Sequence, residues 1–367
     1  MKRRKKSSRR TTVTIRHVAE QSGVSLMTVS RVLNESPNVA EATRVRVQKV
    51  IAQLGFVPHR AARSLRARRS WWIALLFQGA ARELRGDPSY VVELQAGVIE
   101  RCVENGYHAA VERLDASTPI AATQLRELVQ QLAPDGVVLA PPLSSSEELL
   151  ALLRALHVPF ARVAPRSTDG DEPVVFIDDR AASRQMTEHL LSLGHRRIGF
   201  VQGPMQRSYS VRRMAGYRAA LRAWKVREEP ALIVPGDFTF EGGRMAAAQL
   251  LGGGMPPPTA IFASNDESAA GCLADAHQRG LRVPRDLSIA GFDDTYVATM
   301  LYPPLTTMSQ SIREMGRMAT DQVLQLIKGT TPSQAIRIEH RLVERQSTAA
   351  PAVAAVAAQE KSAQQVP

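Results

Sequence analysis

Residues 24–34, VSLMTVSRVLN, place side chains suited to DNA bases on one side of a short helical pattern. Val29, Val32 and Leu33 share the apolar side. The other side holds the candidate DNA contacts Leu26, Met27, Thr28, Ser30, Arg31 and Asn34. An arginine can donate two hydrogen bonds to guanine O6 and N7, apolar side chains meet thymine methyl groups, and hydroxyl or amide groups reach phosphates and base edges. The stretch therefore predicts a helix that reads the major groove.

A second set of polar side chains follows predicted strands of the longer C-terminal region. Asn265 and Asp266 come after AIFAS, and Asp293 and Asp294 come after SIAGF. Open α/β sheets bind ligands at the carboxyl ends of their strands, so we expect a ligand crevice there. Carboxylate and amide groups bind vicinal hydroxyls, and an aromatic ring such as Phe238 can cover the apolar face of a sugar. The pattern favours a hydroxyl-rich ligand.

The elements that would position the first set are three short helices. Thr14 can cap a helix over 15–21, Gly23 supplies a tight turn, and Ser25 can cap the helix quoted above. A third helix is predicted over 41–54, and Gly55 is expected to end it. Two helices separated by a tight turn fit a helix-turn-helix, whose second helix enters the major groove. An ordinary three-helix domain with solvated arginines is the alternative.

The excess of positive charge is concentrated at the N-terminal end of the 367-residue chain. Residues 1–70 carry 17 Lys and Arg against three Glu, whereas the remaining 297 residues carry 30 basic and 32 acidic side chains. We expect residues 1–12 to be a disordered arm, held near a polyanion by charge or simply solubilising. The arginine-rich segment 57–70 has too few apolar groups to fold alone. It can fold on DNA with Leu65 wedged between base steps of the minor groove, or serve as a charged spacer.

The region after residue 70 alternates buried strands with amphipathic helices. Strands are predicted at 72–77, 136–140, 197–201, 260–264 and 287–292. Helices are predicted at 90–104, 120–132, 180–193, 211–223 and 266–279. The fold class is therefore a small all-α helix-turn-helix domain followed by an α/β body, most simply two doubly wound lobes with a cleft between them. The tail from about 349 lacks a leucine heptad and is expected to be disordered.

Several other classes of protein are disfavoured by the sequence. Two cysteines are too few for a disulfide framework or a thiolate metal site, and we expect neither metal nor cofactor. An exported sugar-binding protein is disfavoured by the missing signal peptide and by the basic module, and no apolar run is long enough to span a bilayer. An enzyme is disfavoured because GxGxxG, GxxxxGK[ST], HExxH and GxSxG are missing. A nonspecific architectural DNA-binding protein would need no ligand cleft.

The sequence resembles the lactose-repressor (LacI/GalR) family of bacterial transcription regulators from residue 13 to about 347. The matching stretches are VTIRHVAEQSGVSLMTVSRVLN, VAEATRVRVQKVIAQLGFVPHRAARSL, DDRAASRQMTEHLLSLGHRRIGFVQGP, AIFASNDESAAG, LRVPRDLSIAGFDD and PPLTTMSQ. The resemblance implies a homodimer that binds a pseudo-palindromic DNA operator, with Leu65 of each hinge helix inserted in the minor groove. It also implies a periplasmic-binding-protein-like body with a small-molecule effector, a carbohydrate by analogy, in its cleft. A cytoplasmic location is expected from the cysteine count and from the missing signal peptide and bilayer-spanning run.

The resemblance also implies which residues contact the effector. Positions matching the family's ligand contacts are Arg213, Phe238, Asn265 and Asp293, and those that vary with ligand are Tyr90, Arg207 and Tyr209. Capping and turn formation are alternative roles for Asn265 and Asp293 and the expected roles of Asp266 and Asp294, and Arg212 is expected to be structural.

Ligand identity stays open at this point. Ala164 stands near where sugar-binding relatives often carry an acidic group, and the first loop, FQGAARELRGDPSY, also departs from the family's usual loop. A purine-type corepressor or another small metabolite is therefore an alternative to a sugar. Whether the effector acts as inducer or corepressor is not decided by the residues.

These observations divide the chain into five segments. They are a basic arm at 1–12, a helix-turn-helix domain at 13–57, a hinge helix or linker at 58–70, an effector-binding and dimerisation domain at 71–348, and a tail at 349–367. Within the effector domain, one lobe is expected from about 71–171 plus 303–330, and the other from 172–302 plus 331–348.

Overall fold

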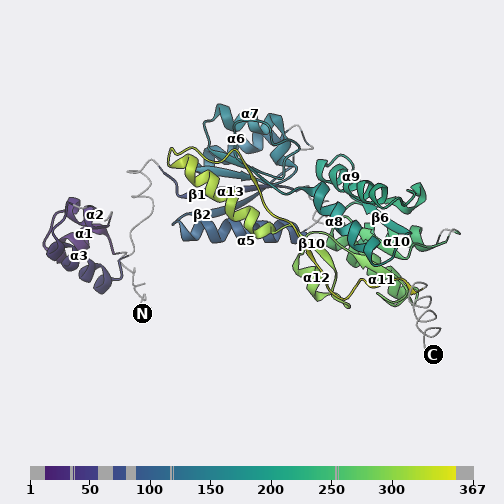
Figure 1. Cartoon of the computed structure of the whole chain (residues 1–367). Coiled ribbons are helices and arrows are strands. Elements are labelled where there is room, and N and C mark those ends of the chain that lie inside the picture. The colour runs from purple at the N-terminus through teal and green to yellow at the C-terminus, as the bar shows by residue number, and fades with distance from the viewer. Residues whose placement is uncertain are drawn as a thin grey trace, which may run out of the picture. The chain divides into compact units, whose positions relative to one another are not determined.

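The chain divides into two compact units, residues 1–70 and residues 71–367, and each unit is described by itself (Figure 1). The structure is a computed structural model. It describes residues 13–33, 36, 38–56, 69–79, 88–115, 118, 120–252, 254 and 256–352. The expected basic arm, residues 57–68 of the linker and residues 353–367 of the tail lie outside the described residues.

The first unit is the expected set of three helices. These are α1 (Ile15–Ser22), α2 (Leu26–Leu33) and α3 (Glu41–Leu54). Val18, Val29 and Val47 are fully buried where the three helices meet. Gly23 and Gly55 follow α1 and α3 with φ of 66° and 58°, a left-handed conformation that glycine adopts without a steric penalty. The two glycines therefore stop these helices where the sequence predicted.

The first lobe of the second unit is built on a parallel six-stranded sheet. Its order is β11-β5-β4-β3-β1-β2, formed by Ala335–Arg337, Val174–Phe176, Phe160–Val163, Gly136–Leu139, Trp72–Gln78 and His108–Leu114. Helices α5 (Pro88–Glu104) and α13 (Ile312–Ile327) pack on one face, and α6 (Ala121–Leu132) and α7 (Glu147–Ala155) cover the other (Figure 1). Both faces are covered, so the inner strands β3 and β4 are buried along their whole length, whereas the edge strands β2 and β11 carry exposed residues.

The second lobe repeats this architecture on a parallel four-stranded sheet. Its order is β7-β6-β8-β9, formed by Ile233–Pro235, Ile198–Gln202, Ala260–Ala263 and Ser288–Ala290. Helices α8 (Asp179–Ser192) and α9 (Ser208–Ala223) pack on one face, α10 (Phe240–Gly252) and α11 (Asp266–Gln278) cover the other, and the short α12 (Tyr296–Met300) contacts α11. The predicted doubly wound lobes are therefore confirmed.

The chain crosses between the lobes three times, and the lobe boundaries differ from those expected from the sequence. The chain passes from β5 to α8, from β9 through β10 (Thr307–Ser309) to α13, and from β11 through β12 (Arg341–Val343) back to the second lobe. Strands β10 and β12 pair antiparallel. Strands β5 and β11 were assigned to the second lobe from sequence, but they pair with each other and with β4 in the first sheet. Each of these two strands has three residues and was not predicted as a strand from the sequence, so its pairing assigns it to a sheet.

Two further details concern the edges of the body. The Trp71 ring lies 5.1 Å from the Tyr107 ring and the Trp72 ring lies 5.0 Å from the His108 ring, both pairs tilted, so both indoles pack at the edge of the first lobe. At the other end, the Ala349 N–H donates to Ser288 Oγ over 3.1 Å. The chain is therefore held to the second lobe through residue 349, where the tail was expected to begin.

Candidate functional site

The outward side of α2 presents large apolar side chains next to a charged one. Leu26 and Met27 are 44% and 55% exposed, and Arg31 is also exposed. On the opposite side, Val29 and Val32 are buried in the core of the unit. Adjacent Leu and Met side chains gain nothing from contact with water, so their exposure marks a surface suited to a partner.

The remaining predicted residues of α2 are placed differently from one another. The Thr28 N–H donates to Ser25 Oγ over 3.1 Å, and the two hydroxyl oxygens are 2.9 Å apart, so Thr28 belongs to the helix cap. Ser30 was expected on the exposed side but is buried, at 9% exposure. Helix α2 packs against both α1 and α3, which narrows its exposed side. Asn34 and Leu65 lie outside the described residues.

Arg213 lies at the centre of a buried polar cluster on the second lobe. Its Nε donates to Asp179 Oδ1 over 3.0 Å, and its Nη1 donates to the Ser264 carbonyl over 2.5 Å and lies 3.6 Å from Asp293 Oδ1. Its Cζ is 3.8 Å from the centroid of the Phe292 ring. Burial lowers the pKa of Arg213, but the charges of Asp179 and Asp293 outweigh burial and the pKa rises. The guanidinium is therefore a fixed, charged donor.

Aromatic rings lie beside this polar cluster. The Tyr209 ring is 5.7 Å from the Phe238 ring and 5.6 Å from Arg213 Cζ. A Cβ on Gly203 would lie 2.0 Å from Phe238 Cζ and 2.6 Å from Ser210 Oγ. Only glycine at position 203 leaves room for the ring. The aromatic surface and the polar cluster together match the two faces of a sugar.

Asn265 and Asp293 have structural partners as well as positions in the cluster. Asn265 Oδ1 accepts the Ser268 N–H over 3.1 Å and caps α11, while Nδ2 donates to the Phe238 carbonyl over 3.0 Å. Asp293 is buried with φ of 118° and accepts a hydrogen bond from Gln310 Nε2. The capping alternative for Asn265 is therefore present in the structure, and it also holds the backbone of Phe238.

Tyr90 reaches the cluster from the first lobe. Burial raises the pKa of its phenol well above the ordinary value, and the charges of Asp293, Tyr209 and Asp179 raise it further. Because Tyr90 lies on α5 and the other groups lie on the second lobe, these interactions connect the two lobes at the cluster.

The structure brings most of the predicted effector residues together and adds others. The contacts above join Tyr209, Arg213, Phe238, Asn265 and Asp293, and electrostatic interactions with Asp293, Tyr209 and Asp179 link Tyr90 to them. Arg207 caps α9 with a partly exposed side chain, and within the described residues no hydrogen bond or ion pair ties that side chain to the cluster. Asp179 and Gln310 were not predicted, although they stand in the quoted stretches DDRAAS and PPLTTMSQ. Only their spatial neighbours distinguish them from other polar residues of those stretches.

The residues expected to be structural have structural partners. Asp266 is fully buried and accepts from the Thr295 N–H over 2.8 Å and from Thr307 Oγ1 over 2.6 Å. Asp294 pairs with Arg345 at 2.6 Å. These bonds fasten α11 and the turn after β9 to the crossing segments.

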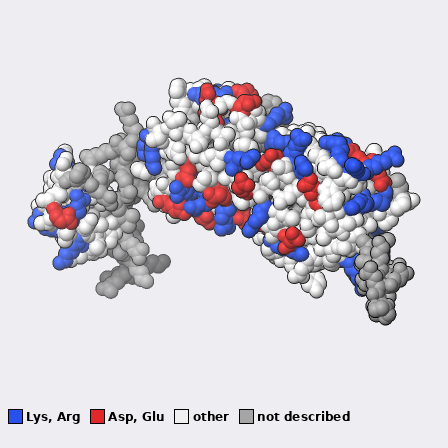
Figure 2. Space-filling model, viewed as in Figure 1, with Lys and Arg blue, Asp and Glu red and all other residues white. Residues whose placement is uncertain are grey.

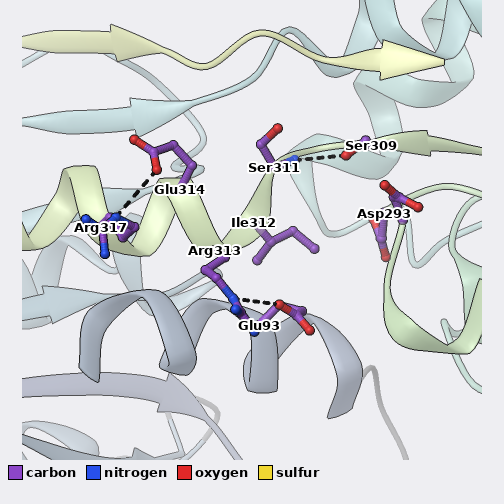
Figure 3. A pocket seen from close by; sticks show the side chains of 9 residues that line it. Glu93, Asp293, Ser309, Ser311, Ile312, Arg313, Glu314 and Arg317 are labelled. Atoms are coloured by element: carbon purple, nitrogen blue, oxygen red, sulfur yellow. Dashed lines mark hydrogen bonds and ion pairs between the residues drawn. The ribbon is translucent and has the colours of Figure 1, made fainter. Parts of the chain in front are cut away.

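A hollow of about 380 Å³ opens beside Asp293, where α5 and α13 approach the turn after β9 (Figure 3). Charged side chains pair within its wall, with Arg313 Nε 3.3 Å from Glu93 and Arg317 Nε 3.7 Å from Glu314. Asp293 therefore borders this hollow as well as contacting Arg213.

Among the described residues, no group of three or more His, Cys, Asp and Glu side chains is arranged to hold a metal ion. No helix in the described part of the chain has the length and apolar character needed to span a bilayer.

Both units match known families. Residues 14–59 match the bacterial regulatory proteins of the lacI family, and residues 187–348 match the periplasmic binding protein-like domain. The HTH-type transcriptional regulator DegA of Bacillus subtilis (strain 168) is 34% identical over 305 residues, which cover 83% of this chain and 88% of DegA. The ribose operon repressor of Escherichia coli (strain K12) is 31% identical over 91% of this chain and 99% of the repressor.

Solved structures agree with these relatives. The Lac repressor dimer bound to operator and the anti-inducer ONPF has a TM-score of 0.77 at 29% identity, covering 93% of this chain and 100% of that chain. The complex of the transcriptional regulator CelR with cellobiose has a TM-score of 0.68 at 31% identity, covering 91% and 99%.

The fold and the two sites define an effector-controlled, DNA-binding transcriptional regulator. The chain belongs to the lacI family of bacterial regulatory proteins. Its relatives are transcription regulators and not enzymes.

Proposed function

We propose that this chain is a homodimeric cytoplasmic repressor of a pseudo-palindromic operator, controlled by a sugar or sugar derivative bound between the two lobes. The observation that carries the proposal is the interlobe cluster. Tyr90 comes from the first lobe, and Tyr209, Arg213 and Asp293 come from the second. A ligand held by both sets bridges the lobes.

The chemistry of the cluster favours a hydroxyl-rich ligand. Carboxylate, guanidinium and amide groups from Asp293, Arg213 and Asn265 bind hydroxyls in pairs, and the rings of Tyr209 and Phe238 cover an apolar face. The relatives are consistent with this class, since one is a ribose operon repressor and one was solved with cellobiose.

Control of DNA binding requires a ligand that prefers one arrangement of the lobes. A ligand with equal affinity for both arrangements shifts nothing, however tightly it binds. We propose that closure on the ligand changes the spacing of the two hinge segments in the dimer and thereby the affinity for the operator.

On the DNA side, we propose that Leu26, Met27 and Arg31 contact base edges and that Thr28 contacts phosphate. The buried Ser30 is a weaker candidate than the sequence indicated. For Asn34 we keep the phosphate or base-edge contact that its residue type and position suggest, and for Leu65 the insertion into the minor groove that the family resemblance implies.

The dimer is supported by an apolar surface on the second lobe. Tyr296, Met300 and Tyr302 lie on and just after α12 and are 52%, 75% and 86% exposed. Met300 follows Tyr296 by one helical turn, so the two share a face of α12. An exposed apolar patch of this kind marks a protein interface, and two-fold dimers bury the same patch of both subunits.

Sedimentation velocity tests the dimer. We expect Met300→Glu to shift the protein toward monomer, whereas Met205→Glu, at an exposed methionine of the same lobe, leaves the dimer intact. An unchanged sedimentation coefficient for Met300→Glu would place the interface elsewhere.

Selection of bound duplexes from a random DNA pool, at near-physiological salt, tests the regulator as a whole. We expect the wild type to enrich a two-fold symmetric site, and Leu65→Ala to lose the preference at its central step. A pool without enrichment, repeated in the presence of candidate sugars and purine bases, would contradict sequence-specific recognition.

The selected operator then allows a ligand test. Mono- and disaccharides are screened beside purine bases for a change in operator affinity. We expect a sugar to act on the wild type and Asp293→Ala to keep operator binding but lose the response. A response to purines alone would reject the sugar class.

A further inference from the structure

The side chain of Arg212 connects the two lobes directly. Arg212 lies on α9 of the second lobe. Its Nη1 donates to the Arg166 carbonyl over 3.3 Å and its Nη2 donates to the Pro165 carbonyl over 3.4 Å, and both carbonyls follow β4 of the first lobe. One guanidinium on a helix of the second lobe therefore donates to two backbone carbonyls of the first lobe.

The loop that Arg212 contacts is anchored within the first lobe. The Arg166 N–H donates to Ser145 Oγ over 2.7 Å. The buried guanidinium of Arg162 donates to the carbonyls of Ser144 over 2.9 Å and Ser167 over 3.2 Å. These bonds hold the loop to the first lobe. The hydrogen bonds from Arg212 to the loop therefore restrain the position of the whole lobe.

Arg212 shares a carboxylate with the central arginine of the cluster. Arg212 Nε donates to Asp179 Oδ2 over 3.3 Å, and Arg213 Nε donates to Asp179 Oδ1 over 3.0 Å. The carboxylate of Asp179 is buried, so its two oxygens depend on these two arginines for charge compensation. Movement of Arg213 therefore changes the electrostatic attraction between Asp179 and Arg212.

We propose that Arg212 and Asp179 form a positioning pair that couples Arg213 to the arrangement of the lobes. This proposal rests on the proposed function, because the pair would let a ligand at Arg213 alter the bonds between Arg212 and the first lobe. A ligand that draws Arg213 away from Asp179 Oδ1 leaves the carboxylate to Arg212 alone, and the bonds of Arg212 to the first lobe weaken.

Amide hydrogen exchange in the full-length, ligand-free protein tests the pair. The variants are Arg212→Ala, Arg212→Lys, Asp179→Asn and the control Arg222→Ala. Arg222 lies on the same helix, is exposed, and pairs with none of the described acidic residues. Basic side chains gather over α8 and α9 (Figure 2), where residues 178–229 carry 11 Lys and Arg against five Asp and Glu. The control therefore removes an equal charge from an equally basic surface.

We expect Arg212→Ala to speed exchange over residues 164–170 by about fivefold, the loss of one modest charge-assisted interaction. Asp179→Asn should act in the same direction. Arg212→Lys should be intermediate, since an ammonium lacks the planar fork that reaches two carbonyls, and Arg222→Ala should have no effect.

Operator affinity, measured well below the unfolding transition, separates positioning from simple stabilisation. We expect Arg212→Ala to shift it by about fivefold and Arg222→Ala to leave it unchanged. Exchange and affinity equal to those of Arg222→Ala would overturn the proposal, and Arg212→Lys decides if Arg212→Ala does not fold. Altered exchange in a protein whose wild type selects no operator would instead reject the proposed function.

Discussion

Gly216 allows α8 and α9 to pack at very short range, and this packing sets the geometry of the cluster. A Cβ on Gly216 would lie 2.3 Å from the Arg180 carbonyl oxygen, 2.8 Å from the Arg184 amide nitrogen and 2.9 Å from the Ser183 Cβ. The first two are backbone atoms of α8, which cannot move unless the helix moves. We therefore expect Gly216→Ala to push α8 and α9 apart.

The magnitude follows from two opposing effects. Overpacking a dense interior costs about 1–3 kcal/mol. Alanine is favoured over glycine inside a helix by about 1 kcal/mol, which offsets part of this cost. The difference is a net loss of up to about 2 kcal/mol in the free energy of unfolding of the body, which lowers Tm by up to a few degrees. Since α9 carries Arg213 and α8 carries Asp179, their 3.0 Å contact should lengthen as well.

Urea unfolding monitored by circular dichroism measures this loss, and Gly252→Ala is the matched control. Gly252 ends α10, and among the described residues a Cβ there would meet the Arg279 guanidinium nitrogens at 3.7 Å and nothing nearer. We expect Gly252→Ala to be neutral or slightly stabilising. Equal midpoints for the two variants would refute the argument that the contact between α8 and α9 has no room for a methyl group.

Three further predictions concern DNA recognition, pH and thiol reactivity. Arg31→Ala should lose about 1–3 kcal/mol of discrimination at one guanine per half-site in quantitative binding assays, whereas uniform weakening across sequences would make Arg31 a phosphate contact. Burial lowers the pKa of His195 below its ordinary value of 6.5. The neutral ring contributes stability above that value that is lost as pH falls below it, so urea midpoints should drop less between pH 7.5 and 5.5 in His195→Gln. Burial raises the pKa of Cys102 and Cys272 to about 12, so both thiols should react with a disulfide reagent at pH 8 only after unfolding, and labelling of the native protein would contradict this.

The sequence by itself determined the architecture, because local signals there agree with the global fold. Gly23 and Gly55 end helices with positive φ, and Ser25 caps α2, as their residue types predicted. The strands predicted from apolar runs are β1, β3, β6, β8 and β9 of the two sheets. Helix caps and apolar patterns depend on residues that lie close together in the sequence, so they can be identified without the tertiary structure.

Only the tertiary structure decided the short strands and the partners of buried charges. Strands β5 and β11 were recognised because they pair with each other, although 158 residues of sequence separate the end of β5 from the start of β11. Ser30 is buried because α2 meets two helices at once. Asp179 lies between Arg212 and Arg213, and Arg212 reaches the first lobe, because α8, α9 and the loop after β4 converge in space. The free energy of a buried charge depends on which groups surround it, and residue type alone does not specify those groups.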